Sequence, residues 1–139
     1  MMRKTIAFVA SLVAVMCLGL LAQEEPSQVN VSKLPPPSKK NGLTYAKHIQ
    51  PMLEKSCFKC HGPEKQKGHM RLDTLENLKK GSRGKPVAVK GKSVKSKIVF
   101  AVARLTEDED DAMPPEGKGD PWTKEQVGIL RAWIDQGMK

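Results

Sequence analysis

One run of five residues, Cys57-Phe58-Lys59-Cys60-His61, constrains this chain of 139 residues more than any other feature. Its two thiols stand three positions apart, so each can add to one vinyl group of a single porphyrin. The histidine directly after the second cysteine is then held beneath the ring, where an imidazole nitrogen can ligate iron. The pattern therefore predicts that Cys57 and Cys60 bind one haem covalently and that His61 is the proximal iron ligand.

The N-terminus has the pattern of an export signal. Arg3 and Lys4 precede an apolar stretch of 17 residues, 6–22, and acidic residues appear only after it. This order is typical of a secretory signal peptide, which we assign to residues 1–22. Because the stretch approaches the length of a membrane span, retention as an uncleaved anchor is the alternative. The protein is expected to be periplasmic or otherwise exported, and membrane-tethered only if the anchor is retained.

The cysteine count favours haem attachment over other uses of the thiol pair. The chain has 3 Cys, of which Cys17 lies in the predicted leader, so only Cys57 and Cys60 remain after cleavage. A thioredoxin-type redox pair would need an alternating strand and helix pattern, which the surrounding sequence lacks. A zinc site is disfavoured because His61 directly adjoins Cys60 and four ligands at a familiar spacing are missing.

Composition divides the rest of the chain into a linker and one small domain. Residues 23–43 contain the triplet Pro35-Pro36-Pro37 and few large apolar residues, which predicts a semi-stiff polyproline II spacer. The remaining segment, 44–139, is assigned to a haem-binding domain. Aromatic residues are sparse there, and a small domain of this kind needs an additional core component, which a covalent porphyrin would supply.

Apolar residues at helical spacing predict four short helices and no strands, so the expected fold class is all-α. The helices are expected around residues 45–57, 73–81, 98–105 and 123–137. Pro51 is expected to open or bend the last turns of the first helix. Asp73 is assigned as the N-cap of the second helix, and Thr123 with Gln126 as the capping box of the fourth. Gly128 would weaken the fourth helix or let another helix approach closely.

The opposite face of the iron needs a second axial ligand, and several residues have suitable side chains. The candidates are His48, Met52, His69, Met70, Met113 and Met138. Met113 is favoured because the second and third helices can cross the haem before it, and because two prolines follow it. Pro114 restricts Met113 to extended backbone angles, and the proline pair stiffens the loop. Met70 and His69, only nine and eight residues past His61, remain the alternatives.

Four sequence elements follow one another in the order Cys57-x-x-Cys60-His61-Gly62-Pro63, Arg71-Leu72-Asp73, Met113-Pro114-Pro115 and Trp133-Ile134-Asp135-Gln136-Gly137. Together they resemble the planctomycete-type cytochrome c domain, a relative of class I cytochromes c, over nearly all of residues 44–138. The resemblance implies a small helical domain wrapped around one covalent haem c, with His61 proximal and Met113 distal. Where the family usually has glycines before Arg-Leu-Asp, this chain has Gly68-His69-Met70.

This ligation predicts a function in electron transfer rather than catalysis. An iron with six ligands has no open position for a substrate, so single electrons would pass by outer-sphere transfer and the protein would not be an enzyme. The alternative is a haem enzyme or a gas or redox sensor, which would need an open or displaceable distal site. Arg71 or Arg104 is a candidate partner for the haem propionates.

The charge distribution indicates what kind of partner is expected. Removing Arg3 and Lys4 from the 24 basic residues leaves 22 against 15 acidic ones, a formal charge of +7. Basic residues gather in the segment 79–97, whereas residues 107–111 are all acidic. We therefore expect redox partner proteins, acidic ones in particular. Nucleic acid is not expected, because the protein is predicted to be exported and its basic segment lacks interleaved aromatic residues.

Overall fold

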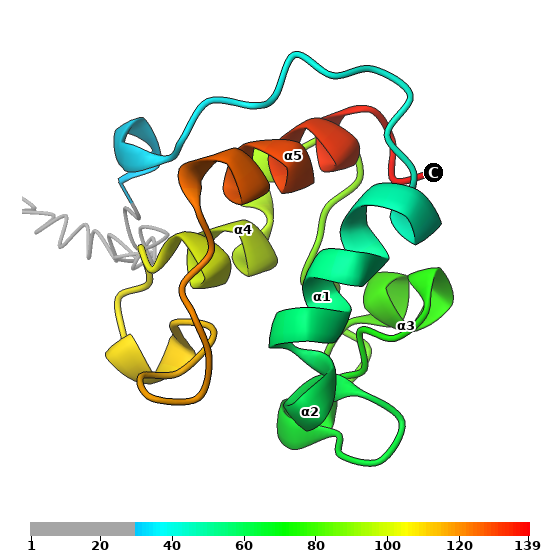
Figure 1. Cartoon of the computed structure of the whole chain (residues 1–139), viewed down its shortest axis with the longest axis vertical. Helices are drawn as coiled ribbons and strands as arrows, with labels where there is room; N and C mark the ends of the chain where they lie inside the picture. Colours follow the sequence, from blue (N-terminus) through cyan, green and yellow to red (C-terminus); the bar gives the residue numbers. More distant parts are fainter. Residues whose placement is uncertain (1–29) are drawn as a thin grey trace, which may run out of the picture.

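Short helices build the fold that the computed structural model describes for residues 30–139 (Figure 1). They are η1 Val31–Lys33, η2 Tyr45–Ile49, α1 Gln50–Ser56, α2 Phe58–His61, η3 Lys67–His69, α3 Leu75–Lys80, η4 Ser93–Lys95, α4 Lys97–Ala103, η5 Glu109–Asp111 and α5 Lys124–Asp135. Within residues 30–139 no strand forms, and extended pairing is limited to two isolated bridges. The all-α prediction is thereby confirmed for this part of the chain. The predicted leader, residues 1–22, lies outside the described residues.

α5, with 12 residues, is the longest helix within residues 30–139. Its N-terminus has the expected capping box, in which the Thr123 hydroxyl accepts from the Gln126 N–H at 3.2 Å and the Gln126 side chain accepts from the Thr123 N–H at 2.8 Å. The helix packs against α4, η4 and η2. Trp133 on α5 is fully buried, and its ring lies 6.0 Å from that of Tyr45 on η2. The C-terminal helix therefore organises the core against the helix that leads into the cysteine motif.

The entry helix is divided in two at Pro51. η2 is a π-helix capped by Thr44, and α1 follows it with Pro51 in its first turn. Proline is tolerated at this place because the N–H groups of a first turn have no partner inside the helix. Pro51 thus opens α1, as the sequence predicted, and Ile49 and Leu53 are fully buried beside it.

α3 begins one residue later than the sequence predicted. Its N-cap is Thr74, whose hydroxyl accepts from the Asn77 N–H at 3.1 Å, and not Asp73. The Asp73 carboxylate instead accepts hydrogen bonds from the Arg71 guanidinium at 3.0 and 2.6 Å and from the Asn77 side chain at 3.2 Å. A two-pronged bond to a guanidinium is stronger than a cap to a neutral N–H, which explains why Asp73 points back toward Arg71.

Residues 34–43 of the proline-rich segment lie along α5 and do not stand off as a spacer. Figure 1 shows them passing above this helix. Leu34 and Leu43 are buried in the core, and the Ser38 N–H donates to the Gly128 carbonyl at 2.9 Å. A Cβ atom at Gly128 would come within 2.8 Å of the Pro36 carbonyl oxygen. The close neighbour that Gly128 admits is therefore the segment 34–43, and not another helix.

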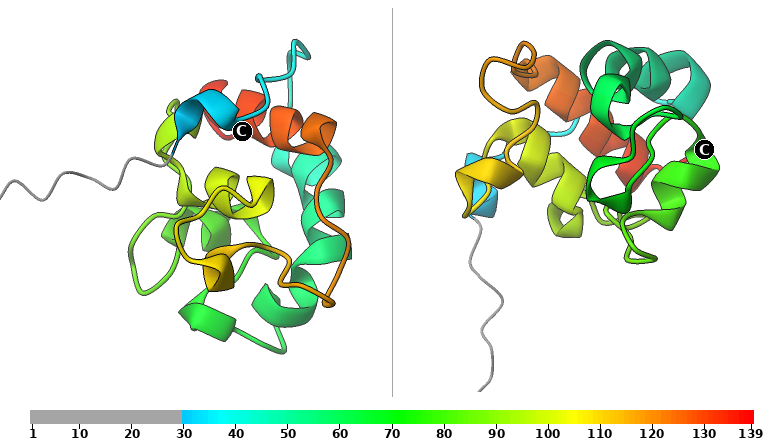
Figure 2. Two further views of the ribbon diagram at one scale, coloured as in Figure 1. Left: turned by 90° about the vertical axis from the view of Figure 1, so that its left-hand side faces the viewer. Right: turned by 90° about the horizontal axis from the view of Figure 1, so that it is seen from below.

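α5 crosses the top of the molecule in Figure 1, and two parts of the chain descend from it and face each other. One is the α1–α2 segment, residues 50–61, and the other is the connection between α4 and α5, residues 104–123. Seen from below in Figure 2, they lie on opposite sides of the molecule. No helix between residues 30 and 139 has both the length and the apolar character that a bilayer crossing needs.

Candidate functional site

The cysteine motif occupies the junction between α1 and α2. The Cys57 N–H closes α1 by donating to the Leu53 carbonyl at 2.6 Å. The Cys57 carbonyl then accepts from the N–H groups of Cys60 and His61 at 3.0 and 2.8 Å. Both cysteines are free thiols, Cys57 buried and Cys60 half-buried. One short helical turn therefore carries both thiols and the histidine.

Gly62 ends this turn. A Cβ atom at this position would overlap the Phe58 carbonyl oxygen, so only glycine lets the chain leave α2 in this direction. The Gly62 N–H donates to the Lys65 carbonyl at 2.9 Å, which folds the following residues back toward the motif. This return places the Lys67 carbonyl beside the ring of His61.

The imidazole of His61 is held in one orientation. Its Nδ1 lies 3.0 Å from the Lys67 carbonyl oxygen, and because a carbonyl only accepts, Nδ1 carries the proton. In the neutral ring Nε2 is then unprotonated and able to bind a metal. Burial lowers the pKa of His61 and so favours this neutral form. The residue's backbone is fixed as well, since its carbonyl accepts from the Leu72 N–H at 2.7 Å.

This donor set fits a covalently attached haem. Two free thiols on one turn can form two thioether bonds, and a neighbouring imidazole presents Nε2 for iron. Burial, together with the nearby Cys60, raises the pKa of Cys57 to about 12, so Cys57 is a neutral thiol at pH 7. Among residues 30–139, no three His, Cys, Asp or Glu side chains gather closely enough to hold a metal ion.

Met113 lies in the connection between α4 and α5, which faces the α1–α2 segment (Figure 1). Its side chain is half-buried, between the buried residues Ala112 and Pro114. The Met113 N–H donates to the Ala101 carbonyl on α4 at 2.9 Å. The sequence pattern did not indicate this contact, because it joins two backbone groups, which every residue type carries.

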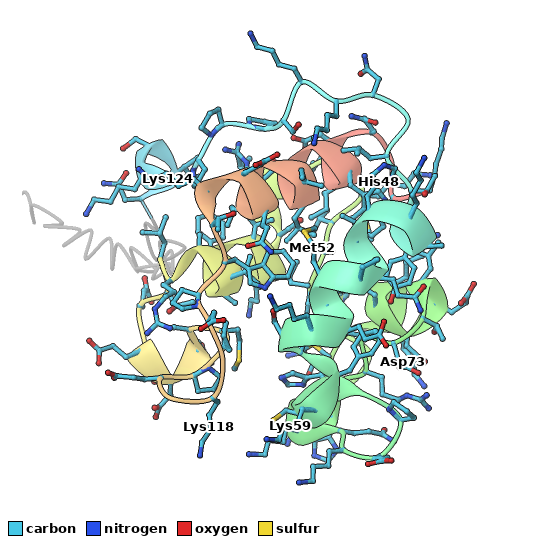
Figure 3. All side chains as sticks on the ribbon, in the orientation of Figure 1. His48, Met52, Lys59, Asp73, Lys118 and Lys124 are labelled. Atoms are coloured by element: carbon cyan, nitrogen blue, oxygen red, sulfur yellow. The ribbon has the colours of Figure 1, made fainter. Side chains whose placement is uncertain are left out.

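The other candidate ligands lie in different surroundings. Met138 is only 2% exposed and belongs to the core beside Trp133. His48, near the top of the entry helix in Figure 3, accepts at Nδ1 from the Thr44 N–H at 3.1 Å. Met52 and Met70 are half-buried against the core, and His69 is exposed.

Both arginines considered for the haem propionates have partners within the protein. Arg71 binds Asp73 through Nε and Nη2, which raises the pKa of Arg71 and lowers that of Asp73. Arg104 donates from Nη1 to the Pro114 carbonyl at 2.9 Å. These contacts were not predicted, because the sequence alone does not indicate which group an arginine side chain will bind.

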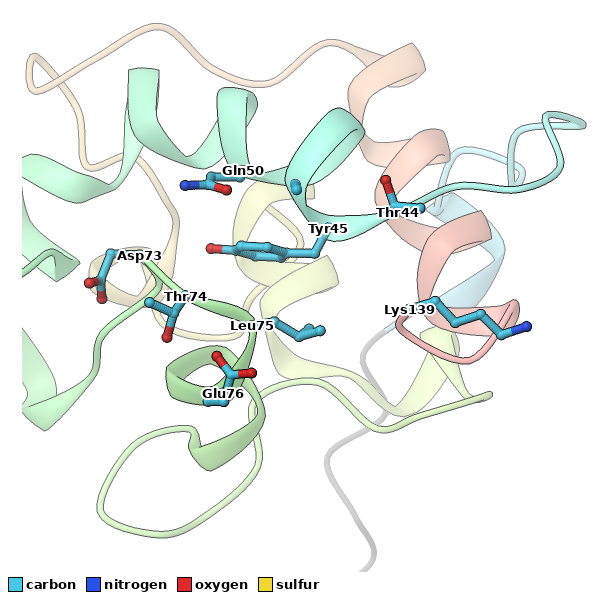
Figure 4. Close-up of a pocket in the computed structure, with 9 residues that line it drawn as sticks. Thr44, Tyr45, Gln50, Asp73, Thr74, Leu75, Glu76 and Lys139 are labelled. Atoms are coloured by element: carbon cyan, nitrogen blue, oxygen red, sulfur yellow. The ribbon is translucent and has the colours of Figure 1, made fainter.

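Of two shallow hollows in the surface, one lies away from the cysteine motif and the other lies against it. The first, about 380 Å³, is shown in Figure 4 between η2 and the start of α3, and Tyr45 reaches across it to donate from its hydroxyl to the Leu72 carbonyl. Burial and the carboxylates of Asp73 and Glu76 raise the pKa of Tyr45 to about 12, so the hydroxyl remains a donor at neutral pH. The second, about 390 Å³, lies against α2 at Phe58 and Lys59. Neither is lined by Cys57, His61 or Met113.

Comparison with known families identifies the region that contains the motif. Residues 57–117 match the family model described as Planctomycete cytochrome C. The matched region begins at Cys57 and includes His61, the Arg71-Leu72-Asp73 element and Met113-Pro114-Pro115. No curated protein and no solved structure matches the chain. The match confirms the resemblance for this region, and a cytochrome c domain implies haem c binding in electron transfer.

Proposed function

We propose that this chain, which carries a planctomycete-type cytochrome c domain, is an exported mono-haem electron carrier. The observation that carries the proposal is the fixed imidazole of His61, whose Nδ1–H is bound by the Lys67 carbonyl while Nε2 is left for iron. The two thiols that would anchor the porphyrin lie on the same turn, so attachment and proximal ligation come from one local structure.

The residues that would hold the haem have separate roles. Cys57 and Cys60 would form the thioether bonds, and His61 would bind the iron from the proximal side. Met113 would bind from the opposite side through its thioether sulfur, a soft ligand that favours ferrous iron. The bound haem supplies a one-electron change between ferric and ferrous iron. If His61 and Met113 both bind the iron, no coordination position would be left for a substrate, so the chain would not act as an enzyme.

Two lysines, one on the α1–α2 segment and one on the connection between α4 and α5, suit an acidic redox partner. Figure 3 shows Lys59 on α2 and Lys118 on the opposite connection, both at the lower end of the molecule. Both are exposed, and within residues 30–139 neither forms an ion pair. Unpaired surface charges of one sign steer an oppositely charged protein to the face that they surround. The membrane would be involved only if residues 1–22 are retained as an anchor.

Carbon monoxide separates this proposal from the alternative, a haem enzyme or a gas or redox sensor. In a carrier closed by Met113, carbon monoxide should bind the reduced protein slowly or incompletely, because it must displace an internal ligand. Rapid and complete binding at neutral pH would instead support an open or displaceable distal site. A pyridine haemochrome spectrum without the signature of thioether bonds would contradict covalent attachment to Cys57 and Cys60.

The axial assignment has its own test. Met113→Ala should abolish the iron–sulfur charge-transfer band and lower the reduction potential, while haem stays covalently attached, because the thioether ligand is lost but both cysteines remain. Met70→Ala is the matched control, since it removes another half-buried methionine, and it should leave the band in place. The reverse result would move the distal ligand to residues 69–70.

A further inference from the structure

Residues 113–115 have few backbone groups that can form hydrogen bonds to the rest of the domain. Pro114 and Pro115 have no backbone N–H, so Met113 supplies the only donor of these three residues. That donor is used by the Ala101 carbonyl at 2.9 Å. Of the carbonyls, that of Pro115 accepts from the Lys118 N–H within a local turn at 3.0 Å. The Pro114 carbonyl accepts a second bond that links this segment to α4, from the Arg104 side chain.

Arg104 supplies this second attachment. Its Nη1 donates to the Pro114 carbonyl at 2.9 Å across ten residues of chain. Arg104 directly follows α4, and its own N–H donates to the Ala101 carbonyl at 3.1 Å. The last turn of α4 thus binds the Met113–Pro114 pair on both sides, through the Ala101 carbonyl before it and the Arg104 side chain after it.

The backbone of Arg104 adopts a conformation that ordinarily favours glycine. Its φ of 55° and ψ of 41° lie in the left-handed region, where a side chain costs free energy. Glycine would remove that strain at the end of α4, but it would also remove the donor to Pro114. Arg104 thus combines a strained backbone with a side chain that reaches Pro114.

We infer that Arg104 is a positioning residue that holds Met113 over the iron and limits how often the distal position opens. The inference rests on the proposed function, because it takes Met113 as the distal ligand. In this role Arg104 acts on Met113 through the Pro114 carbonyl.

The expected effect on ligand affinity follows from an equilibrium between a closed state, in which Met113 binds the iron, and an open state, in which it does not. An external ligand binds only when Met113 has left the iron, so its apparent affinity is proportional to the open fraction. A hydrogen bond from a charged donor shifts such an equilibrium by about 10-fold when it is shielded, and by less when it is exposed to water. Because the Arg104 side chain is exposed, we expect a change of about fivefold.

Arg104→Gly is the decisive variant, and Arg83→Gly is its matched control. Arg83 also has a left-handed backbone, with φ of 50°, and it is exposed and makes no side-chain hydrogen bond within residues 30–139. Both changes remove one positive charge and relieve the same kind of backbone strain. Only Arg104→Gly removes the bond to Pro114, so a difference between the two variants reports on that bond.

Two measurements on the haem-loaded ferric protein test the inference. Arg104→Gly should raise the affinity for imidazole about fivefold and speed hydrogen exchange of the Met113 amide, without lowering the urea midpoint of unfolding. Arg83→Gly should change neither property. If imidazole affinity or amide exchange in Arg104→Gly equals that in Arg83→Gly, the inference is refuted. Arg104→Lys keeps the charge and a hydrogen-bond donor, so its imidazole affinity and its Met113 amide exchange should lie between those of Arg104→Gly and those of the native protein.

The failure of this inference can be told apart from failure of the proposed function. If Met113→Ala abolishes the iron–sulfur band while Arg104→Gly has no effect, Met113 is the ligand and only the role of Arg104 is refuted. If Met113→Ala leaves the band in place, the axial assignment is wrong and the role of Arg104 is refuted with it.

Discussion

Replacing Gly128 by alanine tests how tightly the proline-rich segment is bound to α5. In an isolated helix this change would stabilise by about 1 kcal/mol, because glycine loses more backbone freedom on folding. In this protein the new Cβ atom would lie 2.8 Å from the Pro36 carbonyl oxygen and 3.5 Å from the Ser38 nitrogen. The first contact is closer than carbon and oxygen atoms can tolerate, so the segment must move away from the helix.

The cost of that movement follows from the contacts that hold the segment. Moving it weakens the bond from the Ser38 N–H to the Gly128 carbonyl and the bond from the Arg131 guanidinium to the Pro35 carbonyl. The two hydrogen bonds contribute about 1 kcal/mol each, so moving the segment costs about 2 kcal/mol, which lies within the range of about 1–3 kcal/mol that overpacking typically costs. The exposed pair of Lys40 and Glu125, 3.5 Å apart, adds little. After the gain in helix propensity, we expect a net loss of about 1 kcal/mol.

Urea unfolding followed by far-ultraviolet circular dichroism measures this loss on the haem-loaded protein. A second chain that lacks residues 23–40 supplies the control, because there the Cβ atom at Gly128 meets neither Pro36 nor Ser38. In that chain Gly128→Ala should stabilise by about 1 kcal/mol, so the effect should reverse in sign. A full-length Gly128→Ala variant as stable as the native protein would refute the close packing of segment and helix.

Two further changes test contacts around the first hollow. Tyr45→Phe should lower the free energy of unfolding by about 1–3 kcal/mol without altering the iron–sulfur band, because it leaves the buried Leu72 carbonyl without its donor; an unchanged urea midpoint would contradict this. The pKa of Asp73 is held below its usual value by Arg71, so the pair stabilises the fold at neutral pH and loses that effect as the pH falls below about 4. Arg71→Gln should therefore destabilise the protein at pH 7 and differ less from the native protein at pH 3; equal differences at both pH values would count against the linkage.

Local signals in the sequence predicted the elements that depend on neighbouring residues. The capping box of Thr123 and Gln126 involves residues three positions apart, and both of its hydrogen bonds form. The N-cap of α3 was placed one residue too early because the pattern did not show that Arg71 engages Asp73. Propensity alone does not decide between two partners for the same carboxylate.

Contacts that depend on distant parts of the chain could not be predicted from the pattern. The His61 ring is oriented by the carbonyl of Lys67, a backbone group that every residue type shares. Likewise, two partners of the proline-rich segment, on α5 and at its C-cap, lie 96 residues further along the chain, so composition alone indicated a spacer. The motif specified the chemistry of the site, whereas the turn after Gly62 supplies its geometry.

Docking of the proline-rich segment also changes the reach of a membrane tether, if residues 1–22 are retained as an anchor. A free linker over residues 23–43 would extend up to about 70 Å, at about 3.3 Å per residue. Because Leu34 is buried and residues 34–43 lie against the domain, the chain available as a tether ends at residue 33. Its greatest reach is then about 36 Å. An anchored protein would therefore be confined to partners at or near the membrane surface, whereas a cleaved protein would carry a bound N-terminal segment that contributes to its own stability.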